Sequence, residues 1–147
     1  PGRKAGYSQA SRKADEAENR EVYMPIRMRF MPARALLVSV AHGRLSYDDL
    51  LAHRRHVEAS PHYRPDYHLL FDTRRTSAVG ISGDAIRSFA GFGQSDQRRF
   101  ARMAILVGSD LAYGVSRIFQ AYAGQHDDRT LRIIRDPAEA WRWINER

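Results

Sequence analysis

A serine at the start of a predicted helix is the residue best placed for regulatory chemistry. Ser82 and Gly83 precede a segment with helical apolar spacing that starts near Asp84, a pattern typical of a helix N-cap. The unpaired N–H groups and the positive dipole end of such a helix accommodate a phosphate, which adds about two negative charges. Ser82 is therefore a candidate phosphoacceptor and, with Gly83, a candidate docking site for a partner. Ordinary N-capping explains the same serine equally well.

A second group of polar residues follows two apolar segments that we predict to be neighbouring strands. It comprises Asp72, Thr73, Arg74 and Arg75 after the first segment, and Ser109 and Asp110 after the second. Ligands of open α/β sheets bind beyond the carboxyl ends of the strands, and an arginine can hold a carboxylate or phosphate through two hydrogen bonds. These residues form a candidate ligand mouth. The alternative is structural: Asp72 anchors a loop, the arginines are solvated, and Ser109 caps a helix.

Other catalytic and metal-binding patterns are incomplete. Residues 80–84 resemble the G-x-S-x-G turn of serine hydrolases but lack its last glycine and follow a long loop. His53 and His56 lie three residues apart without a carboxylate partner at fixed spacing, so we interpret them as surface histidines. Residues 91–93 lack the third glycine of a dinucleotide-binding loop. We therefore predict no catalytic residue, no metal and no cofactor, and a protein that is not an enzyme.

Composition narrows the class of protein further. The 147 residues are 43% hydrophobic and include no cysteine, which fits one domain with its own core and excludes a disulfide framework. No segment approaches the roughly 20 apolar residues of a membrane span, and no secretory pattern opens the chain. We expect a cytoplasmic protein without membrane insertion. The net charge is +7, but arginines are interleaved with acids, so we favour a solvated surface over nucleic-acid binding.

Alternating strand and helix patterns organise the chain. Residues 1–22 are polar and predict a flexible extension, whereas 23–147 predict a single domain. Strands are expected at 24–30, 35–40, 67–72, 102–107 and 131–135, and helices after Ser46, Ser82, Ser109 and Asp136. A short connection favours an antiparallel pair at the start, and the helical connections favour parallel strands. The prediction is an α/β fold with a mixed, mostly parallel five-stranded sheet and four helices. Its central strand is 67–72, followed by a polar loop up to Ser82.

This order of segments resembles the SpoIIAA-like branch of the STAS fold from about residue 24 to the end. The resemblance rests on "VSVAHGRLSYDDLLAH", "SPHYRPDYHLLFDTRR", "SDLAYGVSRIF" and "RDPAEAWRWI" in this order and spacing. It implies small bacterial proteins of unassigned function. Anti-sigma-factor antagonists of the STAS group carry an Asp-Ser-Ser-Gly motif whose serine is phosphorylated by a partner kinase. The matching positions here are residues 80–83, which keep the second serine as Ser82 and the glycine as Gly83 and differ at the first two positions.

Three functions remain open on the sequence. The leading hypothesis is a non-enzymatic regulatory module that docks a protein partner through the helix starting at Ser82. The alternative is a binder of a small anionic or lipid-type ligand at the mouth after Asp72 and Val107. Nucleic-acid binding through arginines is the third, and we do not expect it. Exposed aromatics at Tyr113, Tyr122 and Trp143 would form a self-association face, so a homodimer is a further expectation.

Overall fold

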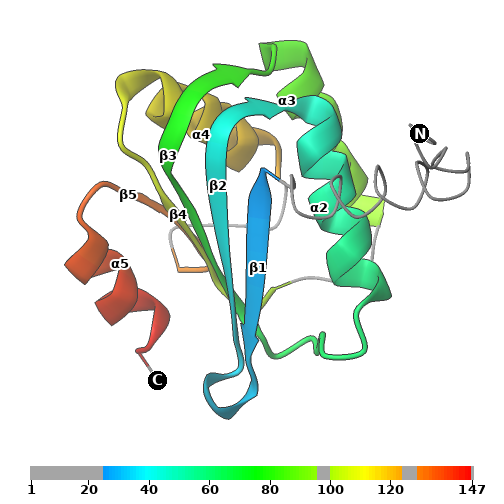
Figure 1. The fold of residues 1–147 in the computed structure, drawn as a ribbon, viewed down its shortest axis with the longest axis vertical. Coiled ribbons are helices and arrows are strands. Elements are labelled where there is room, and N and C mark those ends of the chain that lie inside the picture. The colour runs from blue at the N-terminus through cyan, green and yellow to red at the C-terminus, as the bar shows by residue number, and fades with distance from the viewer. Residues whose placement is uncertain (1–24, 96–99, 124–128, 147) are drawn as a thin grey trace, which may run out of the picture.

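The computed structural model describes residues 25–95, 100–123 and 129–146, and the extension predicted at 1–22 lies outside these ranges. Within them the chain forms one five-stranded sheet in the order β1-β2-β3-β4-β5 (Figure 1). The strands are β1 (Ile26–Met31), β2 (Leu36–Ser46), β3 (His68–Gly80), β4 (Met103–Leu106) and β5 (Leu131–Ile134). Strand β1 is antiparallel to β2 and the other neighbours are parallel. The predicted mixed sheet with β3 at its centre is confirmed.

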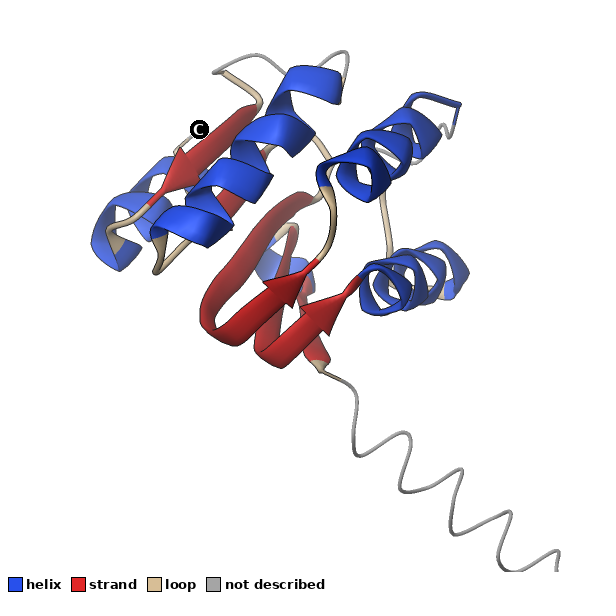
Figure 2. Cartoon of the chain, turned by 90° about the horizontal axis from the view of Figure 1, so that it is seen from above, coloured by secondary structure: helices blue, strands red, loops and turns tan. Residues whose placement is uncertain are grey.

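Helices cover both faces of this sheet (Figure 2). They are α2 (Tyr47–Ala59), α3 (Gly83–Ser95), α4 (Asp110–Tyr122) and α5 (Pro137–Ile144), with a 3-10 turn η1 (Pro32–Arg34) between β1 and β2. Side chains of α2, α3 and α4 pack on one face, and α5 packs alone on the other. Among the described residues, none of the helices combines the length and apolar character required to cross a membrane.

The polar segment 73–80, which we predicted to be a loop, is the second half of β3, so that prediction is wrong. Strand β2 is also longer than predicted and stays paired with β3 as far as Ser46 and Gly80. Strand β4 ends at Leu106, so the far parts of β2 and β3 form a two-stranded ribbon beyond the sheet. Two register irregularities and a left-handed Gly43 (φ 67°) accompany the bend of this ribbon. It delivers the chain to the starts of α2 and α3 (Figure 1).

The predicted helix starts are confirmed in detail. Each N-cap oxygen accepts a hydrogen bond from a backbone N–H in the first turn of its helix. These bonds are Asp49 N to Ser46 Oγ (3.2 Å), Ala85 N to Ser82 Oγ (3.1 Å), Ala112 N to Ser109 Oγ (3.1 Å) and Ala138 N to Asp136 Oδ1 (3.0 Å). Helix α3 continues through Gly91 and Gly93 to Ser95. A glycine inside a helix costs only about 1 kcal/mol relative to alanine, which packing can offset.

Helix α4 packs on the sheet through a face that combines small and larger side chains. Leu111 and Tyr122 lie off this face and are 59% and 46% exposed. The buried positions are the small residues Ala112 and Ser116. The larger Val115, Ile118 and Phe119 are half-buried and also pack against the core.

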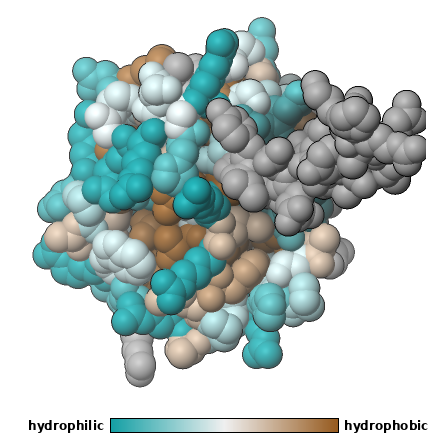
Figure 3. Space-filling model, viewed as in Figure 1, coloured by the Kyte–Doolittle hydropathy of each residue, from teal (hydrophilic) through white to brown (hydrophobic). Residues whose placement is uncertain are grey.

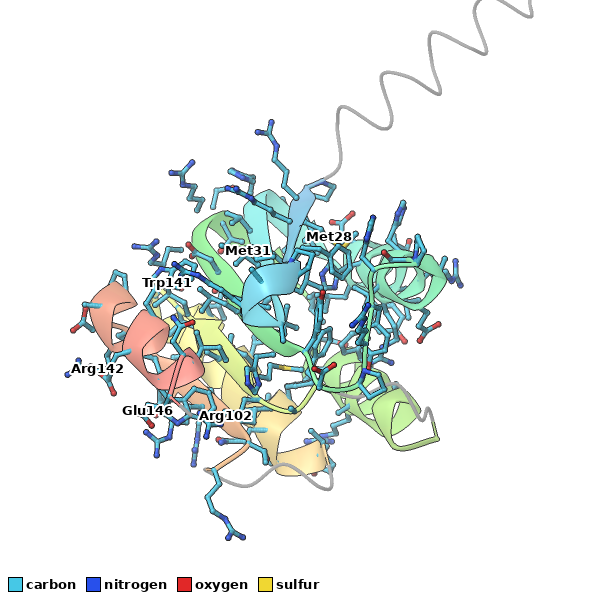
Figure 4. The ribbon with its side chains drawn as sticks, turned by 90° about the horizontal axis from the view of Figure 1, so that it is seen from below. Met28, Met31, Arg102, Trp141, Arg142 and Glu146 are labelled. Carbon is cyan, nitrogen blue, oxygen red and sulfur yellow. The ribbon has the colours of Figure 1, made fainter. Side chains whose placement is uncertain are left out.

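Arg102, just before β4, holds the carboxyl end of α5 against the sheet. Its Nη1 donates hydrogen bonds to the backbone oxygens of Trp143 (3.2 Å) and Glu146 (2.6 Å), in the region viewed from below in Figure 4. A cation is favourable beside the carboxyl end of a helix, where backbone oxygens gather. Trp143, which we expected near the surface, is only 4% exposed and belongs to the core beneath α5.

Candidate functional site

A cavity lies between the sheet and the helices α2, α3 and α4, with a volume of about 170 Å³. Its floor includes Leu69, Phe71 and Thr73 of β3, which share one face because side chains alternate along a strand. Strand β4 adds Met103 and Ile105. An apolar cavity of about 150 Å³ is large enough for benzene. The space can therefore take a small organic molecule.

The helices supply a mostly apolar roof to this cavity. Leu50 and Val57 come from α2, Ile86 and Phe89 from α3, and Ala112, Val115 and Phe119 from α4. The side chain of Ala112 is short, and Ser116 of the same helix is also small. Small side chains on α4 thus help to keep the space open.

Arg54 joins two of the helices at the edge of the cavity. Its Nη1 donates a hydrogen bond to the backbone oxygen of Phe89 at 3.1 Å, and its guanidinium carbon lies 3.8 Å from the centre of the Phe89 ring. Arg54 and Glu58 of α2 both contribute to the cavity lining. Charged groups therefore stand at this side of an otherwise apolar space.

His53 is the buried titratable group of the cavity, and our prediction that it is a surface histidine is wrong. It is 8% exposed, whereas His56 on the same helix is exposed. Its Nε2 lies 2.8 Å from Oγ of Ser39, and its ring centre lies 5.5 Å from that of Phe71. Burial, and to a lesser extent the charges of His56 and Arg54, lower the pKa of His53 from 6.5 to about 4. At neutral pH the imidazole is therefore uncharged.

Of the six residues in the predicted mouth, only Thr73 lines the cavity. Its Oγ1 donates a hydrogen bond to the backbone oxygen of Leu106 at 2.9 Å, which ties β3 to the end of β4. Strand alternation turns the neighbouring Asp72 and Arg74 toward the α5 side of the sheet. The sequence prediction placed these residues after the end of their strand, which is wrong because β3 continues to Gly80, and it did not separate the two faces of the sheet.

Asp72 and Arg74 form a two-pronged ion pair. Arg74 Nε donates to Asp72 Oδ1 at 3.1 Å and Nη2 donates to Oδ2 at 2.9 Å, while the backbone N–H of Arg74 adds a bond to Oδ1 at 3.0 Å. Burial alone would raise the pKa of Asp72. The hydrogen bonds and charge of Arg74, with the charge of Arg75, outweigh burial and lower that pKa. Both carboxylate oxygens are therefore already engaged within the protein.

Ser109 and Asp110 lie next to this ion pair because β3 passes close to Gly108. A Cβ atom at position 108 would lie 3.3 Å from the Cα of Arg74, which is tighter than most real Cβ contacts, so a larger residue would require a small shift of one of the two backbones. Ser109 caps α4, and Asp110 accepts a hydrogen bond from Arg135 at 2.8 Å. Arg75 is exposed. Anion binding by this group stays a prediction.

Ser82 is exposed at the start of α3, where its hydroxyl caps the helix. Gly83 follows it and is half-buried, with Ile118 of α4 nearby. The preceding Ile81 is buried and lines the cavity. Ser82 is therefore an accessible hydroxyl directly beside the cavity wall.

Two other groups bear on the choice of site. In the described part of the chain, no three His, Cys, Asp or Glu side chains are grouped so that they could hold a metal ion.

On the α5 side, the space-filling view shows apolar residues ringed by hydrophilic ones (Figure 3). There Val38 and Val40 of β2 are half-buried and pair with the exposed Arg29 and Arg27 of β1. Such a surface is ordinary for a solvated sheet edge, and we assign no ligand to it.

Comparison with known proteins defines the fold. No protein-family model matches the chain, and no curated protein matches its sequence. A crystal structure does match: an uncharacterised protein of the DUF3478 family from Shewanella loihica PV-4, described as having a SpoIIAA-like fold. The alignment has a TM-score of 0.52 at 17% identity and covers 81% of this chain and 91% of that one. The protein has a SpoIIAA-like α/β fold, as the sequence predicted, and its function has to be argued from its own site.

Proposed function

We propose that this is a non-enzymatic, cytoplasmic SpoIIAA-like domain that binds a small, mostly apolar molecule in the cavity beneath α2, α3 and α4. The observation that supports the proposal is the cavity of about 170 Å³ with its largely apolar lining. This keeps the lipid-type ligand suggested by the sequence but moves its site. The ligand lies under the helices, and the ion pair of Asp72 and Arg74 stays outside the binding space.

The energetics of packing favour a filled cavity. Protein interiors are close-packed and rarely keep spaces larger than a water molecule. Apolar surface that stays in contact with water in this space is unfavourable to the fold. A ligand that buries its apolar surface there gains roughly 25 cal/mol for each Å² removed from water. A ligand that binds in this space should therefore also raise the free energy of unfolding of the protein.

A substitution that fills the cavity tests this function. We expect Ala112→Leu to weaken the binding of toluene by at least about tenfold, because the larger side chain occupies the same space. NMR titration of the full chain with toluene measures the affinity. The matched control is Ala121→Leu, the same change at an exposed position of α4, and it should bind toluene like the wild type. Wild-type protein that shows no saturable binding of toluene would contradict the proposal.

Docking of a protein partner at the start of α3 is the second candidate function. Its support is the exposed hydroxyl of Ser82 at a helix N-terminus, in the position that the STAS resemblance marks for phosphorylation. A phosphate at this end of α3 would meet unpaired N–H groups and would change the charge of the surface. Because the neighbouring Ile81 lines the cavity, a partner bound here would contact the cavity wall.

For this second function we expect Ser82→Asp to change partner binding without unfolding the domain. Aspartate is as good an N-cap as serine, so thermal stability should stay within about 0.5 kcal/mol of the wild type. Quantitative pull-down with both proteins measures the effect. Ser109→Asp is the control, because Ser109 caps α4 with the same geometry. Equal recovery of every partner by wild type and Ser82→Asp would speak against docking at this site.

A further inference from the structure

We infer that the ligand of the cavity is an uncharged molecule whose apolar body carries a carbonyl oxygen, and that this oxygen accepts a hydrogen bond from His53 Nδ1. The inference rests on the proposed binding function and adds the chemical class of the ligand. It follows from three features of His53: its bond to Ser39, the state of its second ring nitrogen, and its lack of charge.

The bond to Ser39 determines which ring nitrogen carries the proton. Ser39 is fully buried on β2, and among the described residues its hydroxyl has one hydrogen-bond partner, His53 Nε2 at 2.8 Å. If Nε2 carried the proton, the hydroxyl hydrogen of Ser39 would be buried without an acceptor. A buried unpaired donor is costly, so the hydrogen-bond network assigns the hydroxyl as donor and Nε2 as acceptor. The proton of the neutral imidazole is then on Nδ1.

The Nδ1–H group has no acceptor within the described chain. No side chain or backbone oxygen there makes a hydrogen bond to it, and it is also not enclosed. Of the buried polar side-chain atoms in the described residues, the one without a partner is Nδ1 of His68. His53 lines the cavity, and we take its unpartnered Nδ1–H to face that space. A donor in an apolar cavity selects a ligand that brings an acceptor.

The charges around the cavity exclude an anionic head as the preferred acceptor. Burial and the charges of His56 and Arg54 keep the pKa of His53 near 4, so it offers a neutral donor at pH 7. The guanidinium of Arg54 is already held against the oxygen and ring of Phe89, and the carboxyl of Glu58 stands on the same side. A carboxylate would lose its hydration here without a dedicated countercharge. A ketone, ester or aldehyde meets the donor without that loss.

Three probes of one shape test the inference. They are 4-methylacetophenone, 4-ethyltoluene, which has CH₂ in place of the carbonyl, and 4-methylbenzoate, which is charged. In NMR titrations of the full chain at pH 7, we expect the ketone to bind about fivefold more tightly than the hydrocarbon, as one added hydrogen bond predicts. The carboxylate should bind most weakly. A long-range ¹H–¹⁵N correlation of His53 should shift at Nδ1 with the ketone and not with the hydrocarbon.

The double variant Ser39→Ala/His53→Leu removes the donor together with its buried partner. It should lose the preference for the ketone over 4-ethyltoluene, whatever its affinity for the hydrocarbon itself. His56→Leu, at an exposed position of the same helix, is the control and should keep that preference. The ¹⁵N signature requires only wild-type protein, so the test holds even where the double variant is unstable.

The outcomes separate this inference from the proposed function. Equal affinity for ketone and hydrocarbon, or a ketone preference that survives in the double variant, would overturn the inference and leave apolar binding intact. Tightest binding of the carboxylate would also overturn it. Failure of all three probes to bind would remove the inference together with the proposed function.

Discussion

Replacing Arg74 with methionine is expected to lower the free energy of unfolding by about 2–3 kcal/mol, because it leaves the buried carboxylate of Asp72 without its partner. The Asp72 side chain is 11% exposed, and both of its oxygens accept bonds from the guanidinium. Methionine keeps the apolar stem that packs at the sheet edge but supplies no donor. Urea denaturation at pH 7 measures the loss.

Two further variants and the pH dependence of stability in acid test whether the loss comes from the broken ion pair. Arg75→Met removes the neighbouring exposed arginine and should change stability by less than about 0.5 kcal/mol. Adding Asp72→Asn to Arg74→Met should restore part of the loss. The pKa of Asp72 is lowered in the folded wild type, so its contribution is complete above pH 3.8 and disappears as the pH falls below that value. Without Arg74, burial dominates and raises this pKa, so the deficit should shrink in acid. A deficit that is constant with pH would contradict this account.

This ion pair also bears on ligand binding at the strand ends. An anion at the predicted mouth would have to compete with Asp72 for the guanidinium of Arg74. Breaking a paired, partly buried charge costs several kcal/mol, which a single exposed arginine such as Arg75 does not replace. The strand ends are therefore better explained as a structural joint between β3 and the turn before α4. The cavity on the other face has no such competitor.

Local patterns made much of the fold predictable from the sequence. The four N-caps are set by a side chain and a backbone N–H within three residues, so the sequence alone defines them. The buried stretch before Asp72 is apolar on both faces, as expected for a central parallel strand. The SpoIIAA-like order of elements follows from these two kinds of signal.

The second half of β3 was not predictable because its pairing is non-local. Residues 73–80 are mostly polar or small, and in the sequence they are indistinguishable from a loop. They are extended because β2 continues alongside them as far as Ser46. Neither strand would be stable alone at this length beyond the sheet, so each extension depends on the other.

The cavity is a second feature that periodicity could not reveal. A helix that packs tightly and a helix that roofs an empty space show the same apolar stripe. The useful signals were finer: His53 lies between Leu50 and Val57 at helical spacing, which places it on the inner face of α2. Ala112 and Ser116 likewise place small residues inward on α4. Ser39, the hydrogen-bond partner of His53, lies on β2. The role of His53 could therefore not be inferred without the fold.

Acidification from pH 7 to pH 4 is expected to lower the free energy of unfolding by about 3 kcal/mol through His53 alone. The pKa of His53 falls from 6.5 to about 4 on folding. Between these pH values His53 binds a proton in the unfolded chain but stays neutral in the folded chain. This difference lowers the free energy of unfolding by about 1.4 kcal/mol for each pH unit of acidification. The contribution is complete above pH 6.5 and is lost as the pH falls toward 4. Urea denaturation at intervals across this range measures it.

His53→Gln should abolish this part of the pH dependence, because glutamine can still bond to Ser39 but does not titrate. His56→Gln changes an exposed histidine on the same helix and should leave the slope between pH 6.5 and 4 nearly unchanged. The titration of Asp72 lies below this window, so the two effects separate. Equal slopes in wild type and His53→Gln would show that His53 is not held neutral by burial.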